Sequence, residues 1–388
     1  MIEKLKRVVK TSGFMNFISS VCAIVVGLLF GLIILLCTNP AQAFPAFLTI
    51  LKGGFTGASG MGQVIYYAVP IIMTGLSVGF AFKTGLFNIG ASGQFIVGAF
   101  AAVFVAIKFT ALGPFTWVVA VLVAIIAGGI WGIVPGLLKA YANVNEVISS
   151  IMMNYIGMYL VNFLVRTFIF DQLRNQSIQV PSESNIPRLG LDKLFDNSSM
   201  NGGIFIAIIV VVVIYIVLNK TIFGYELKAC GQNSEASKYA GINSKRNIIM
   251  SMIISGALSG LGGALLYLAG AGKNIQVLDL LAVEGFNGIP VALLGLSNPI
   301  GVLFSGMFIA HITVGGINLQ NFDFVPEIID IIVASIIYFS AFSLLFKSVI
   351  TVVLKRNATK KQEKVSVTLE QATISSDEAP KEEQGGNL

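Results

Sequence analysis

The stretch that decides how this chain is organised is Thr221–Arg246, TIFGYELKACGQNSEASKYAGINSKR. It is a long polar insert between two apolar runs and carries a net positive charge. Asn233 or Ser234 is placed to cap the start of a helix, and Gly241 is placed to end it. The spacing therefore predicts a helix of about two turns, which is too short to be stable alone in water.

Two small residues, Ala236 and Ala240, lie four apart and share one face of this predicted helix. Glu235 lies in its first turn, and lysines surround it. A short helix between two membrane spans, with a small-residue face, is typical of a docking element. The spacing alone fits an ordinary helical loop of the cytoplasmic side equally well.

The composition of the rest of the chain identifies the fold class. Of 388 residues, 55% are hydrophobic and only 11% are charged, whereas charged residues make up about a quarter of a soluble domain. The apolar runs exceed the roughly 18 residues that indicate a membrane span. We therefore predict an all-α, polytopic integral membrane protein. Its net charge of +6 indicates no nucleic-acid partner, because the lysines follow the membrane topology.

The apolar runs predict about ten transmembrane helices, some of them broken or short. They cover residues 17–38, 63–82, 86–107, 115–138, 146–170, 202–219, 247–271, 280–297, 300–317 and 327–350. Glycines and prolines interrupt the eighth and ninth, which are predicted to be short. The basic leader and Ala41-Gln42-Ala43 imitate a cleaved signal peptide, but Phe17–Thr38 is long enough to be a retained first span.

The basic residues give the orientation, because they are enriched in cytoplasmic loops. One side of the predicted topology carries Lys4, Lys6, Arg7, Lys10, Lys83, Lys139, Lys220, Lys228, Lys238, Lys245, Arg246 and the run from Lys347 to Lys381. Both termini and the insert are therefore predicted to be cytoplasmic. The domains are a cytoplasmic N-terminus (1–16), a membrane domain (17–353) with an extracellular loop (171–200) and the cytoplasmic insert (220–246), and a disordered tail (354–388). The extracellular loop fits either contact with an external partner or a solvated connector.

Two polar interruptions of the membrane domain resemble each other. Lys83–Gln94 combines three glycines with Asn88 and Gln94, and Gly285–Leu296 repeats a Phe-Asn pair that ends in Asn287. Paired Gly/Pro-interrupted segments in the two halves of a transporter indicate its substrate region. The alternative is close helix packing through glycine. We interpret the glycines as packing residues and the asparagines as candidates for the pathway.

The start of the fifth predicted span carries three further candidates. Asn145 is placed to cap the helix, and Glu146 in the first turn is favoured by the helix dipole. Asn154 lies about two turns deeper, where an unpaired amide is costly. Its side chain is therefore expected to bond to a neighbouring helix or to face a pathway.

These stretches together resemble a known family. The matching runs are GLFNIGASGQ (Gly85–Gln94), NEVISSIMMNY (Asn145–Tyr155), GQNSEASKYAGI (Gly231–Ile242), SGALSGLGGA (Ser255–Ala264) and the start of Gly285–Phe308. They resemble the permease subunits of ABC importers of the branched-chain amino acid and ribose group, and more narrowly the bacterial nucleoside and simple-sugar permeases. Family members usually carry Glu where Ser92 stands, and Arg where Lys228 stands.

The resemblance implies a transport subunit of the bacterial plasma membrane. The insert would be the coupling loop, seated on a separate cytoplasmic ABC ATPase through Lys228, Gly231, Asn233, Ala236, Ala240 and Gly241. A second, homologous permease subunit and an external substrate-binding lipoprotein would complete the importer. The chain would hold no ATP site, catalytic residue, metal or cofactor. Its substrate would be a nucleoside, or alternatively ribose or another sugar, since the candidate amides suit both.

Two other classes of protein compete with this interpretation. An ion-coupled secondary transporter usually has ionisable residues inside the membrane, whereas the central spans here are almost free of charge. An intramembrane enzyme would need a metal or acid–base site, and the only histidine, His311, stands alone in an apolar run. We interpret His311 as a packed, hydrogen-bonded residue.

Overall fold

The structure is a computed structural model that describes residues 12–352 except 197, 271, 323, 325, 341, 343 and 344. Most of the predicted cytoplasmic N-terminus and the whole predicted disordered tail (354–388) lie outside the described residues. Apart from one short hairpin, the described part of the chain is built of helices, as predicted.

Ten apolar helices correspond to the ten predicted spans. The eight long enough to cross a membrane are α2 (Ser12–Thr38), α4 (Ala58–Lys83), α5 (Ala91–Lys108), α6 (Thr116–Ala142), α7 (Glu146–Phe168), α9 (Gly203–Lys220), α12 (Ser244–Tyr267) and α14 (Pro299–Ile317). Two are shorter, α13 (Val283–Leu294) and α15 (Pro326–Ser340). The fold therefore agrees with a polytopic membrane protein.

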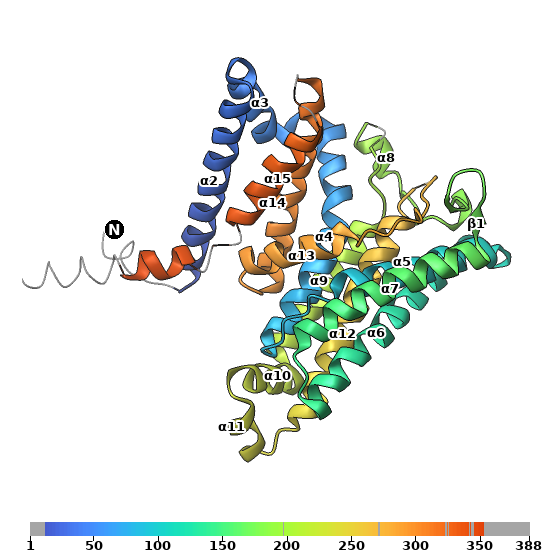
Figure 1. Cartoon of the computed structure of the whole chain (residues 1–388), viewed down its shortest axis with the longest axis vertical. Coiled ribbons are helices and arrows are strands. Elements are labelled where there is room, and N and C mark those ends of the chain that lie inside the picture. Colours follow the sequence, from blue (N-terminus) through green and yellow to red (C-terminus); the bar gives the residue numbers. More distant parts are fainter. Residues whose placement is uncertain are drawn as a thin grey trace, which may run out of the picture.

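The remaining elements lie at the two ends of the bundle (Figure 1). One end carries α3 (Pro40–Lys52), the strands β1 (Phe170–Asp171) and β2 (Gln176–Ser177), and α8 (Leu191–Leu194). The other end carries α10 (Ile222–Gln232) and α11 (Ser234–Tyr239). Short 3-10 turns cover Gly53–Phe55, Thr110–Phe115, Ser182–Ser184 and Asn318–Asn321. By the positive-inside rule, we expect the α3 end to be extracellular and the α10–α11 end to be cytoplasmic, and we name the two ends accordingly.

Helix α12 lies at the centre of the bundle, where it packs on α4, α5 and α6, and α4 packs in turn on α13 and α14. Helix α4 is the most enclosed span, with 89% of its central window buried. Close packing of α6 on α12 depends on glycine: a Cβ at Gly128 would lie 2.8 Å from the Gly260 Cα. Small residues at such crossings allow helix backbones to approach closely in membranes.

The structure corrects the predicted bounds of two spans. The third begins at Ala91 rather than near residue 86, because Gly85 (φ +73°) ends α4 and the chain stays non-helical up to Gly90. The ninth, predicted to be short, is the full-length helix α14 with 19 residues. The break instead lies in the eighth span, where an extended segment precedes the 12-residue α13.

Two helices were not expected from the sequence. Helix α3 follows α2 directly at the extracellular end, with Pro40 in its first turn and buried Ala43, Ala46 and Ile50 on one face. Helix α10 occupies the first half of the polar insert, where only a loop was expected. The extracellular loop 171–200 is also ordered: β1 and β2 form an antiparallel hairpin, and Ile186 N–H donates to the Leu268 carbonyl at 2.9 Å.

Candidate functional site

The polar insert folds into two consecutive helices, α10 and α11, which we call the cytoplasmic helix pair. Asn233 separates them and caps α11, because its Oδ1 accepts a hydrogen bond from Ala236 N–H at 3.0 Å. Gly241 (φ +79°) ends α11, where Ile242 N–H donates to the Ser237 carbonyl at 3.0 Å. The two predicted ends of the short helix are confirmed, and Asn233 rather than Ser234 is its cap.

Helix α10 begins at a cap of its own, since Thr221 Oγ1 accepts a hydrogen bond from Gly224 N–H at 3.1 Å. The half-buried Lys228 lies on this helix. Two contacts fasten the pair to the base of α12. Asn247 Nδ2 donates to the Glu226 carboxylate at 3.2 Å, and Ser244 Oγ donates to the Ser234 carbonyl at 3.3 Å.

A third contact fastens the pair to α4. Gly231 near the end of α10 packs on the turn after α4, where a Cβ at Gly231 would lie 2.5 Å from the Lys83 carbonyl oxygen. Gly85 in this turn faces back, and a Cβ there would lie 3.2 Å from the Gly231 Cα. The helix pair is therefore in backbone contact with the segment that leads to Asn88.

The outer face of α11 is uncovered. Ala236 and Ala240 are both exposed, and Tyr239 is 94% exposed. Glu235 and Lys238 pair along the helix at 2.6 Å. A well-capped helix that is held by its neighbours and presents a small-residue face has the geometry of a docking element.

Asn88 and Gln94, both predicted pathway residues, meet in the core. Asn88 Nδ2 donates to Gln94 Oε1 at 2.8 Å and to Ser255 Oγ at 2.7 Å, and Gln94 Nε2 donates to Asn88 Oδ1 at 3.3 Å. The Ser255 hydroxyl donates to the Ser77 carbonyl at 2.7 Å. These four polar residues are at most 1% exposed. We call them the buried amide network; it joins the non-helical segment after α4 to α12.

Asn154 holds the same segment from the side of α7. Its Nδ2 donates to the Ile89 carbonyl at 3.0 Å, and its Oδ1 accepts from Gly93 N–H at 2.8 Å. The side chain is 1% exposed. Asn154 is therefore bonded to a neighbouring element, which was one of the two expected alternatives.

The other three predicted pathway residues lie apart from this network. Asn145 caps α7 by accepting from Val147 N–H at 2.8 Å, and Glu146 forms an ion pair with Lys139 at 2.9 Å. Asn287 lies on α13, is half-buried, and has no hydrogen-bond partner among the described residues. The glycines next to it pack closely, since a Cβ at Gly288 would lie 2.5 Å from the Thr74 carbonyl carbon.

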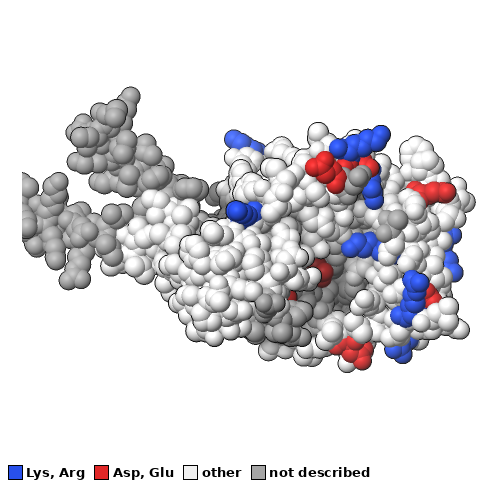
Figure 2. Space-filling view, turned by 90° about the horizontal axis from the view of Figure 1, so that it is seen from above, with Lys and Arg blue, Asp and Glu red and all other residues white. Residues whose placement is uncertain are grey.

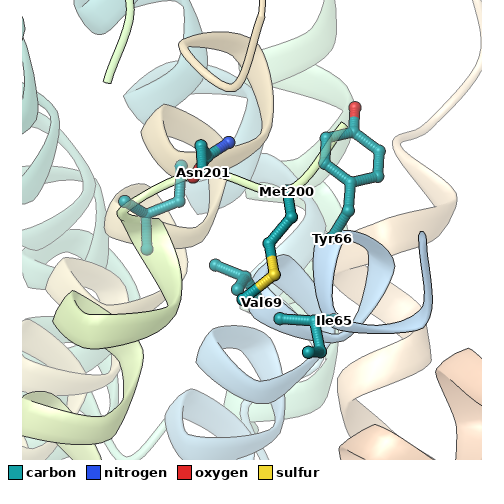
Figure 3. Close-up of a pocket in the computed structure, with 6 residues that line it drawn as sticks. Ile65, Tyr66, Val69, Met200 and Asn201 are labelled. Carbon is teal, nitrogen blue, oxygen red and sulfur yellow. The ribbon is translucent and has the colours of Figure 1, made fainter. Parts of the chain in front are cut away.

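Three hollows among the described residues are either small or apolar. The void between α4, α9 and α12 that Figure 3 shows, next to Tyr66, Met200 and Asn201, has a volume of about 10 Å³, room for one water at most. Two larger grooves, of about 550 and 430 Å³, border α2 and α14 and are lined mainly by apolar side chains. The second groove includes His311, whose Nδ1 accepts from Gly54 N–H at 3.3 Å, as expected for a packed histidine. Among the described residues, no group of three His, Cys, Asp or Glu side chains could hold a metal ion.

Several residues that the sequence did not single out belong to these arrangements. Ser77 and Ser255 complete the buried amide network, and Thr84 Oγ1 pairs with Ser251 Oγ at 2.8 Å one turn below. Single serines in apolar helices carry little signal, although Ser255 opens the SGALSG run. Asn162 on α7 and Asp279 were also missed; they lie 3.1 Å apart.

Comparison with known proteins identifies the family. The family profile described as branched-chain amino acid transport system / permease component matches residues 60–371. The chain is 36% identical to the guanosine ABC transporter permease protein NupP of Bacillus subtilis, over 87% of this chain and 96% of that protein. It is 35% identical to the nucleoside ABC transporter permease protein NupB of Lactococcus lactis, over 82% and 89% of the two chains. The glucose ABC transporter permease protein TsgB13 of Haloferax volcanii is 32% identical, over 75% and 78%.

No solved structure matches this chain. The relatives and the eight long apolar helices make it a multi-pass protein of the bacterial plasma membrane. The chain belongs to the family of branched-chain amino acid transport system permease components.

Proposed function

We propose that this chain is the permease subunit of an ATP-driven importer of nucleosides. The observation that carries the proposal is the identity of 36% with a guanosine permease, sustained over 96% of that protein's length. Membership of a transport-permease family gives no support to the ion-coupled transporter or to the intramembrane enzyme. Sugars remain the second candidate substrate, because a glucose permease is 32% identical.

The cytoplasmic helix pair is the proposed seat of a separate ABC ATPase subunit. The exposed face that carries Ala236 and Ala240 supports this role, because a helix with small side chains on one face can fit closely into a groove of a partner. Lys228, Asn233 and Gly241 would hold the shape of the pair, and Gly231 would pass its movement to α4. ATP binding and hydrolysis on the partner would then move the segment that carries Asn88.

The substrate pathway is proposed to run beside α13. Asn287 supports this placement, because it is a half-buried amide whose side chain has no partner among the described residues. Asn88, Gln94 and Asn154 are internally bonded in this state, so they would reach a substrate only when α5 moves away from α7 or α12. Asn145 and Glu146 would form the cytoplasmic edge of the path.

Two further partners belong to the proposal. A second, homologous permease subunit would face the open side of α7 and α13, with the substrate path between the two subunits. An external substrate-binding lipoprotein would deliver the nucleoside to the extracellular end. The ordered hairpin and the loop 171–200 support this role, because they form a built surface there.

Uptake measurements in cells that lack this gene test the proposal. Cells with and without the gene are compared for uptake of labelled guanosine, ribose and glucose at micromolar concentration. Loss of guanosine uptake that the restored gene recovers supports the nucleoside importer. Loss of ribose or glucose uptake alone would replace the nucleoside with a sugar, and unchanged uptake of all three would refute both.

A further inference from the structure

The segment that precedes α13 enters the bundle in an extended conformation. It leaves the extracellular hairpin at Gln276, which bridges to Gln176, and it runs to Ala282, whose carbonyl accepts a hydrogen bond from Ser92 Oγ at 2.8 Å. We call residues 276–282 the extended segment. At its inner end, the Glu284 carbonyl accepts from Thr74 Oγ1 at 3.1 Å.

These contacts place the extended segment at membrane depth. Helix α4 begins with Ala58 at the extracellular end. At 1.5 Å per residue, Thr74 lies about 24 Å along the helix axis from Ala58. Asn162, which donates to the Leu278 carbonyl at 3.0 Å, lies about 9 Å along α7 from its extracellular end. The segment therefore descends from the surface to the middle of the membrane.

One side of the extended segment is open. Leu278 is 46% exposed, Leu280 is 73% exposed, and Asp279 between them is exposed as well. Non-helical backbone at membrane depth does not face lipid, because its unpaired polar groups would lack partners. This side must therefore face a water-filled path or another protein.

Asp279 decides between a water-filled path and a dry contact with another protein. Its Oδ1 accepts a hydrogen bond from Asn162 Nδ2 at 3.1 Å, and no Lys or Arg among the described residues pairs with it. A carboxylate without a cation is costly in a dry protein contact as well as in hydrocarbon, so this side faces an aqueous cavity. Seen from the extracellular end, the surface of the molecule is hollowed near its centre (Figure 2).

The neighbouring face of α7 continues inward from Asp279. Tyr159 and Tyr155 lie on the same face as Asn162, spaced three and four residues apart, and are 57% and 46% exposed. Aromatic rings at such positions offer flat surfaces to a sugar or a base, with a hydroxyl for hydrogen bonding. The two tyrosines therefore lie on the same exposed face of α7 as Asn162, the residue that holds the carboxylate.

We propose that Asp279, oriented by Asn162, binds the 2′ and 3′ hydroxyls of a ribonucleoside in the aqueous path. This inference rests on the proposed nucleoside transport and adds the recognised group and its residue. Asn162 occupies only one carboxylate oxygen, and the other oxygen accepts hydrogen bonds from a vicinal diol. Hydrogen bonds to a charged group contribute about 1.5–3 kcal/mol, so a nucleoside without these hydroxyls binds about tenfold or more weakly.

A cysteine-accessibility experiment on the full importer tests the inference. Leu280→Cys is placed in a chain whose native cysteines Cys22, Cys37 and Cys230 are replaced by serine, and intact cells receive a charged, membrane-impermeant thiol reagent. We expect the reagent to modify the cysteine at position 280, and guanosine to slow this modification. The concentration of 2′,3′-dideoxyguanosine needed for the same protection is expected to be about tenfold higher. Ile126→Cys, on the exposed face of α6, is the control and is expected to stay unmodified.

Removal of the carboxylate completes the test. With Asp279→Ala added, guanosine is expected to lose its protective effect, whereas Asp192→Ala in the extracellular loop leaves the protection unchanged. An unreactive Leu280→Cys, equal protection by both nucleosides, or protection that survives Asp279→Ala would each overturn the inference. Guanosine uptake by the wild-type chain is measured in parallel, because its absence would instead contradict the proposed function.

Discussion

Gly231 of the cytoplasmic helix pair and Gly85 of the turn after α4 pack backbone against backbone. A Cβ at Gly231 would lie 2.9 Å from the Gly85 amide nitrogen and 2.5 Å from the Lys83 carbonyl oxygen. Three residues beyond Gly85 is Asn88, the centre of the buried amide network. This contact is a direct physical route from the proposed ATPase seat to the membrane core.

This route predicts that Gly231→Ala uncouples ATP hydrolysis at the cytoplasmic helix pair from transport through the membrane core. The added methyl group cannot be accommodated without moving α10 away from α4, because its nearest neighbours are backbone atoms. We expect guanosine transported per ATP hydrolysed to fall several-fold in reconstituted vesicles, while the permease still copurifies with its ATPase. Gly270→Ala, where a Cβ meets open space, is the matched control and should behave as wild type. An unchanged transport ratio in Gly231→Ala would argue against this route.

The exposed face of α11 predicts that Ala236→Glu impairs ATPase binding and transport more strongly than Gly231→Ala does. A longer, charged side chain on this face should block the seat of the ATPase while leaving the membrane domain folded, because Ala236 is exposed. Copurification of the ATPase subunit and guanosine-dependent ATP hydrolysis should both be lost. The control is Ala142→Glu, the same change at an exposed cytoplasmic end of α6. Normal copurification of Ala236→Glu would contradict the docking role.

The cap of α11 predicts a graded effect at Asn233. Asn233→Ala removes the bond to Ala236 N–H and should destabilise α11 by about 1 kcal/mol. The apparent affinity for the ATPase subunit, measured by titration in detergent, should weaken about fivefold if docking requires the formed helix. Asn233→Ser should restore most of the affinity, since serine is also a good cap. Failure of Asn233→Ser to differ from Asn233→Ala would show that the cap is not the cause.

The buried amide network predicts a stability effect at Asn88. Asn88→Leu leaves the buried Gln94 amide without its partner, and a buried unsatisfied polar group costs about 1–3 kcal/mol. The thermal unfolding midpoint of the purified protein should fall clearly. The double variant Asn88→Leu with Gln94→Leu should be destabilised by less than the sum of the single changes, because the two residues are partners. Strict additivity would contradict the network.

Local signals explain what could be predicted from the sequence. Asn233 and Gly241 define the ends of α11 through side-chain and backbone bonds within a few residues, so both ends could be predicted. The ten apolar runs were likewise readable, because length and hydropathy decide a membrane span. Asn145 was correctly expected to cap α7.

Tertiary contacts explain what could not be predicted. The extended segment has the same apolar composition as a helix, and its conformation depends on distant partners such as Asn162 and Ser92. Asp279 carries no motif, and only the fold brings it to membrane depth beside α7. Helix α10 was missed because Gly224 and Gly231 indicate a loop, whereas here they permit close approach to α9 and α4.

One measurement tests the central claim that ATP, acting through the cytoplasmic helix pair, drives nucleoside uptake by this chain. Uptake of labelled guanosine is followed in cells that lack the gene and carry either the wild-type chain or Ala236→Glu, with the proton and sodium gradients collapsed and cellular ATP maintained. We predict uptake by the wild-type chain and none by Ala236→Glu. Uptake that disappears with the gradients, or that continues in Ala236→Glu, would contradict the account.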